Sequence, residues 1–72
     1  MSTIFYYGRR VWVRWDHPDE PPGFPYAGKV LQVEGVWARK IRVETDEPVG
    51  NGLNQKVNVY MYWDVRIPPE PN

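Results

Sequence analysis

The chain has 72 residues, nine basic and nine acidic side chains and no cysteine, which predicts a single domain over residues 1–72. Without cysteine and with His17 as the one histidine, neither disulfides, cysteine-ligated zinc nor a multi-histidine metal site is expected. No apolar run approaches the roughly 20 residues that a transmembrane helix needs, so we expect no membrane partner and a cytoplasmic location. We also expect no metal and no cofactor.

The first half of the chain predicts a short N-terminal arm, a strand over residues 10–15, a long loop and a second strand over residues 28–34. In the first strand Val11 and Val13 alternate with Trp12, so the valines face a core and Trp12 faces outward. Four prolines between residues 16 and 27 favour an irregular loop. A bulge between Val30 and Val33 would turn both toward the core.

The second half predicts three more strands. Residues 36–44 alternate in favour of a strand, and residues 45–56 form a loop with a hairpin turn at residues 50–52. In a fourth strand over residues 57–63 the pattern favours Val57, Val59 and Met61 inside, with Tyr60 and Tyr62 outside. A one-turn link leads to a short fifth strand over residues 65–67 and a proline-rich C-terminal tail.

This layout predicts an all-β fold, a single five-stranded SH3-like barrel, because closure of such a sheet hides its edges. The predicted core consists of aliphatic side chains: Val11, Val13, Val30, Val33, Ile41, Val43, Val57, Val59, Met61, Val65 and Ile67. These side chains alone offset too little backbone entropy, so aromatic rings must also pack, within the barrel or against another chain.

Local stretches resemble three groups of small barrels. The acidic loop at residues 16–27 and the segment 29–41, in which Trp37 precedes an Ala-Arg pair, resemble peptide-binding SH3 domains; in these the loop attracts a basic residue and the tryptophan stacks on proline. Residues 11–14 and 24–27 resemble PWWP and Tudor domains, which implies an aromatic cage from Trp15, Tyr26 and Trp37 for a methylated ammonium.

The third resemblance is to plasmid-borne type II dihydrofolate reductases, whose Val-Gln-Ile-Tyr strand is similar to residues 57–60. That family forms a tetramer around a pore in which the Gln, Ile and Tyr hold folate and nicotinamide. Asn58 stands at the position of the Gln and shortens its reach. The resemblance therefore implies oligomer formation more strongly than it implies catalysis.

The remaining motifs indicate little chemistry. Six basic residues could contact single-stranded nucleic acid if they lay on one face, namely Arg9, Arg10, Arg14, Arg39, Lys40 and Arg42. The neutral net charge argues against this, and cross-strand ion pairs are the competing interpretation. His17 beside Asp16 lacks a nucleophile to activate, so an enzyme is not expected.

We therefore expect a non-enzymatic binding or assembly module that contacts itself or a peptide through exposed aromatic side chains. The alternatives are a nucleic-acid-binding barrel and a pore-forming oligomeric reductase. A small free-standing barrel of this kind fits a phage, plasmid or mobile gene-cassette product. The predicted contact residues are Trp12, Trp15, Tyr26, Trp37, Tyr60 and Tyr62.

Overall fold

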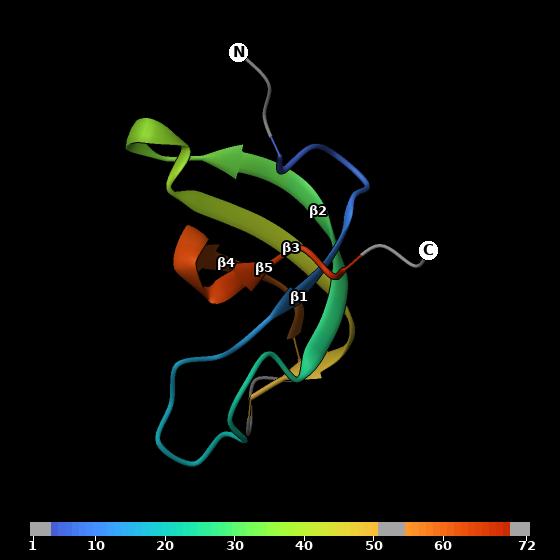
Figure 1. Cartoon of the computed structure of the whole chain (residues 1–72), viewed down its shortest axis with the longest axis vertical. Helices are drawn as coiled ribbons and strands as arrows, with labels where there is room; N and C mark the ends of the chain where they lie inside the picture. Colours follow the sequence, from blue (N-terminus) through green and yellow to red (C-terminus); the bar gives the residue numbers. More distant parts are fainter. Residues whose placement is uncertain (1–3, 51–54, 70–72) are drawn as a thin grey trace.

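The structure, a computed structural model, describes residues 4–50 and 55–69 and contains five antiparallel strands in one curled sheet (Figure 1). The strands are β1 (Arg10–Val13), β2 (Tyr26–Glu34), β3 (Lys40–Val49), β4 (Gln55–Met61) and β5 (Val65–Arg66). Two single turns of 3-10 helix, η1 (Val36–Ala38) and η2 (Tyr62–Asp64), connect β2 to β3 and β4 to β5. The predicted all-β fold with five antiparallel strands is confirmed, and the sheet curls into a half-barrel in which β4 and β5 are the edge strands.

The strand order in the sheet is β4-β3-β2-β1-β5, so the first and last strands of the chain, β1 and β5, lie next to each other. β1 lies between β2 and β5, pairing Val13 with both Tyr26 and Val65. The predicted bulge in the second strand is present as a register shift between Val30 and Gln32. It lets Val30 lie in the core and Val33 pack against it.

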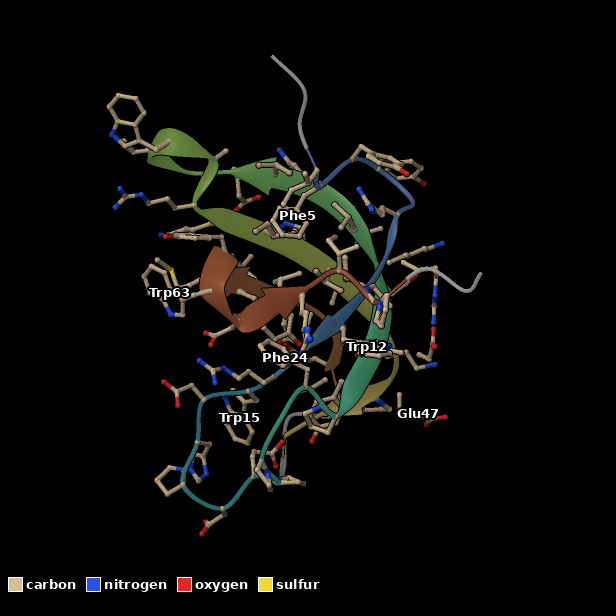
Figure 2. All side chains as sticks on the ribbon, viewed as in Figure 1. Phe5, Trp12, Trp15, Phe24, Glu47 and Trp63 are labelled. Carbon is tan, nitrogen blue, oxygen red and sulfur yellow. The ribbon has the colours of Figure 1, made fainter. Side chains whose placement is uncertain are left out.

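The core lies inside the curl and combines aliphatic side chains with two rings. Its buried residues are Phe5, Val11, Val13, Val30, Ile41, Val43, Tyr60 and Val65, with Tyr26, Val33 and Ile67 packed against them. Phe5, which belongs to the predicted N-terminal arm, fills volume that the aliphatic residues leave (Figure 2). The expectation that aromatic rings must join the core is met by Phe5 and Tyr60.

The facing predicted for the fourth strand is wrong. Val57 and Val59 are 39% and 40% exposed, whereas Tyr60 is only 6% exposed. Cross-strand partners share a face of the sheet, and the buried Ile41 pairs with Tyr60. Because β3 turns Ile41 inward, the even-numbered residues of β4 face the core and the valines face outward.

Several predicted boundaries also move. The segment 36–44 is not one strand, because residues 36–38 form η1 and β3 begins at Lys40 and continues to Val49. β1 ends at Val13, so Trp15 lies in the following loop. Gly50 has the positive φ expected of the hairpin turn, and the rest of that turn, at residues 51–52, falls outside the described residues. In the described ranges no helix is long and apolar enough to cross a bilayer.

Candidate functional site

The six aromatic residues predicted to make contacts are spread over the molecule and do not form one surface. Trp12 is exposed on the outer face of β1, and Tyr62 is exposed in η2. Trp37, in η1, is 83% exposed. Trp15 and Tyr26 are half-buried at the two ends of the β1–β2 loop.

Tyr60 is not a surface residue, and its prediction as an exposed contact is wrong. Its ring lies in the core because it pairs with Ile41 across β3 and β4. The predicted outward pair of Tyr60 and Tyr62 therefore does not exist. The sequence alternates valines with tyrosines in this strand, so periodicity alone could not decide which set faces inward.

An aromatic cage of Trp15, Tyr26 and Trp37 does not form. Tyr26 begins β2 and Trp37 follows its end, and a strand of nine residues separates them. At about 3.3 Å per residue, the backbone of β2 between its two ends is roughly 25–30 Å long, which is too far for the two rings to share a cage. The SH3 resemblance implied that Trp37 lies beside the acidic loop. It does not, because β2 separates Trp37 from that loop.

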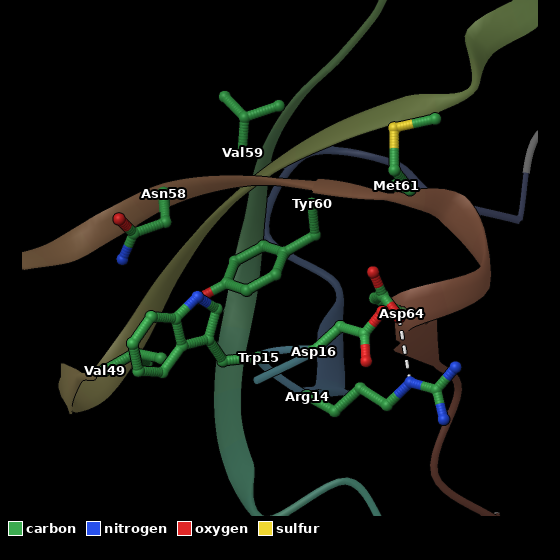
Figure 3. A pocket seen from close by; sticks show the side chains of 9 residues that line it. All are labelled: Arg14, Trp15, Asp16, Val49, Asn58, Val59, Tyr60, Met61 and Asp64. Carbon is green, nitrogen blue, oxygen red and sulfur yellow. Dashed lines mark hydrogen bonds and ion pairs between the residues drawn. The ribbon is translucent and has the colours of Figure 1, made fainter. Parts of the chain in front are cut away.

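A hollow of about 260 Å³ lies under β4, between that strand and the residues that follow β1 (Figure 3). Tyr60 and Asn58 point down into it from β4, while Val59 and Met61 turn their side chains away to the other side of the strand. The residues that line the hollow are Arg14, Trp15, Asp16, Val49, Asn58, Val59, Tyr60, Met61 and Asp64.

The Tyr60 hydroxyl is buried beside this hollow and finds no hydrogen-bond partner among the described residues. Burial raises the pKa of the phenol above its usual 10.0; the nearby Asn58 amide lowers it, although its Nδ2 donates to the Gln55 carbonyl rather than to the phenol. A buried hydroxyl without a partner is costly, so it marks a place where another group could bind. Sequence reasoning missed this feature because it placed Tyr60 on the surface.

One wall of the hollow is an ion pair. The Arg14 Nε donates to Asp64 Oδ1 at 2.8 Å, and the Arg14 backbone N–H donates to the Asp64 carbonyl at 3.0 Å. The guanidinium also lies 5.2 Å from the centre of the Phe24 ring. Arg14 thus ties the end of β1 to η2 and to the loop, and its charge is used within the fold.

The β1–β2 loop is organised by its own side chains. The Trp15 and His17 rings stack at 4.5 Å, and His17 Nδ1 accepts a hydrogen bond from the Asp19 N–H at 3.2 Å. The Tyr26 hydroxyl donates to Glu20, and this bond raises the pKa of Tyr26. One of the loop's acidic side chains is therefore engaged within the chain.

The six basic residues considered for nucleic acid do not form one face. Arg42 of β3 pairs with Glu34 of the neighbouring β2, Arg10 of β1 pairs with Asp46 of β3 across the intervening β2, and Arg14 pairs with Asp64 of η2. The competing interpretation, ion pairs between strands, holds for Arg10 and Arg42, whereas Arg14 is paired outside the strands. Arg39 and Lys40, beside η1, form no ion pair within residues 4–50 and 55–69.

β4 carries a row of backbone groups that β3 does not use. The Tyr62 N–H donates to the Arg39 carbonyl at 2.8 Å, one register step beyond the Lys40–Met61 pair. Hydrogen-bonded and non-hydrogen-bonded pairs alternate in an antiparallel ladder. The N–H and C=O groups of Val57, Val59 and Met61 therefore point away from β3, and we call them the free edge of β4.

The described residues hold no group of three or more acidic or histidine side chains placed to bind a metal ion. Comparison with protein-family models, with curated proteins and with solved structures finds no match for this chain. The hollow, the free edge of β4 and the exposed side chains are therefore the features of the molecule that can carry a function.

Proposed function

We propose that this protein is a non-enzymatic assembly module that associates with itself by pairing the free edges of two β4 strands. The observation that carries the proposal is the free edge itself. Within the described ranges β4 pairs only with β3, which leaves the outward backbone groups of Val57, Val59 and Met61 available. A strand edge of this kind is a template for another strand.

The edge is self-complementary. If two copies meet about a two-fold axis at Val59, each Val59 faces its counterpart and Val57 faces Met61 of the second copy. The backbone N–H and C=O groups of all three residues point away from β3. Each facing pair of residues can therefore form two N–H···O=C hydrogen bonds between the copies. A register shifted by one residue would oppose outward groups to inward ones and lose these bonds.

The side chains of β4 support the same arrangement. Val57 and Val59 are each about 40% exposed, and Met61 is half-buried on the same outer face. No charged residue lies between Lys56 and Asp64, so the edge lacks the charges that commonly prevent strand pairing. Neutral net charge also favours association.

Sedimentation velocity across a range of concentrations tests the proposal. The Val59→Pro variant removes an N–H from the free edge, and the fold should tolerate it because β3 does not use that N–H. We expect the wild type to dimerise and Val59→Pro to stay monomeric. Val59→Thr, which keeps the N–H and the branched side chain, is the matched control and should dimerise.

Amide hydrogen exchange tests the register independently of any variant. In the dimer the amides of Val57, Val59 and Met61 should gain protection as protein concentration rises, while those of Asn58 and Tyr60 should be protected throughout. A chain that remains monomeric at millimolar concentration, with these three amides exchanging freely, would refute the proposal.

A further inference from the structure

The turn between β2 and β3 presents aromatic and basic side chains together. η1 and η2 lie on the same side of the molecule (Figure 1), and the hydrogen bond from the Tyr62 N–H to the Arg39 carbonyl joins them. Trp63, in η2, is half exposed and points outward from this side (Figure 2). We call the set Trp37, Arg39, Lys40, Tyr62 and Trp63 the tip patch.

The backbone holds Trp37 in an unfavourable conformation. Trp37 has φ 61° and ψ 26°, and the next residue, Ala38, has φ 53°. Two successive positive φ values are typical of a type I′ turn, whose preferred residues are Asn and Gly. Non-glycine residues in this region are strained, and such strain is common at functional sites. Here the strained turn displays an indole that is 83% exposed.

The charges of the tip patch are of one sign. Arg39 and Lys40 are both exposed and, in the described chain, neither pairs with a carboxylate. Glu34, the partner of Lys40 across β2 and β3, accepts hydrogen bonds from Arg42 at 3.2 and 3.3 Å. Within the described residues the tip patch therefore combines two cations that have no carboxylate partner with three exposed rings.

We propose that the tip patch binds single-stranded nucleic acid, with bases stacked on Trp37 and on the exposed rings of η2 and with phosphates held by Arg39 and Lys40. Exposed rings interleaved with cations are the combination that binds unpaired bases without sequence preference. A duplex hides its base faces, so it offers the cations a partner but leaves the rings unused. An anionic bilayer would also attract the cations and accommodate the rings, so binding to vesicles is made an outcome of the test.

Fluorescence anisotropy of a labelled oligo(dT) strand at low salt tests the proposal with the intact chain. Two phosphate contacts predict a slope of about −1.4 for the logarithm of the association constant against the logarithm of salt concentration. Arg39→Gln should reduce the magnitude of this slope by about 0.7.

The decisive variant is the double substitution Trp37→Asn with Ala38→Gly. It supplies the residues that the turn prefers, so the fold should be retained or strengthened, which thermal unfolding verifies. Loss of one stacked base should weaken binding roughly 5- to 150-fold. Trp12→Phe, on the outer face of β1, is the matched control and should leave binding unchanged.

Three outcomes would overturn the proposal. These are absence of oligo(dT) binding at low salt, undiminished binding by the double variant, and binding to phosphatidylserine vesicles without binding to oligo(dT). The proposed strand pairing is tested separately, because Val59→Pro leaves the tip patch intact and the double variant leaves the free edge intact. Either proposal can therefore fail while the other stands.

Discussion

Replacing Tyr60 by Phe should stabilise the monomer, although removal of a tyrosine hydroxyl usually destabilises a protein. The ring is 6% exposed, and its hydroxyl has no hydrogen-bond partner in the described chain. A buried hydroxyl in this state costs about 1–3 kcal/mol. Phe keeps the buried ring and removes that cost, so we expect the free energy of unfolding to rise by about 1 kcal/mol or more.

Urea unfolding at a protein concentration low enough to keep the chain monomeric measures this change. For a domain of this size, about 1 kcal/mol corresponds to a rise of roughly 4–8 °C in Tm. Tyr26→Phe is the matched control, because the Tyr26 hydroxyl does donate to Glu20. Its loss should lower the free energy of unfolding by about 0.5–1.5 kcal/mol.

The comparison of the two variants separates the explanations. If Tyr60→Phe destabilises the monomer by as much as Tyr26→Phe, the Tyr60 hydroxyl has a partner and its role as a marker of the hollow is lost. If Tyr60→Phe stabilises the monomer but weakens association, a group of the second copy satisfies the hydroxyl in the dimer.

Three further predictions follow from burial, backbone contact and ionisation. Val43→Thr buries a hydroxyl and should cost about 1–3 kcal/mol in urea unfolding, whereas Val57→Thr, on the exposed face, should change stability by less than about 0.5 kcal/mol; equal costs would contradict the facing of β4. Gly28→Ala would place a methyl group 2.5 Å from a carbonyl oxygen of β3 and should lower the free energy of unfolding by about 1–3 kcal/mol. This loss should exceed that of Gly8→Ala, where φ is +85° but no atom lies within 4 Å of the new methyl group. The reverse order would be evidence against the close approach of β2 and β3. Because burial raises the pKa of Tyr60, the folded chain holds the phenol proton more tightly than the unfolded chain, so this contribution to stability is complete below pH 10.0 and is lost as the pH rises above it. Between pH 8 and pH 11 the urea midpoint should therefore fall further in the wild type than in Tyr60→Phe. An equal fall in both would show that Tyr60 is not the group responsible.

Much of the fold could be predicted from local patterns. Alternation placed Val11 and Val13 inside and Trp12 outside, and the spacing of Val30 and Val33 indicated the bulge in β2. The prolines of the β1–β2 loop excluded regular structure there, as the structure confirms for residues 14–25. These features depend on neighbouring residues alone, because side-chain alternation and proline geometry act within a few positions.

The facing of β4, the hollow and the tip patch depended on tertiary structure. Either set of alternating residues in β4 is apolar enough to be buried, and pairing with β3 through Ile41 and Tyr60 selected one of them. The same pairing turned Val57 and Val59 outward and created the free edge. Trp37 is exposed because the chain reverses direction at η1. A hydrogen bond between residues 39 and 62 then brings this turn to η2. Cross-strand partners far apart in the chain set these features, and alternation within one strand carries no information about which partner it will meet.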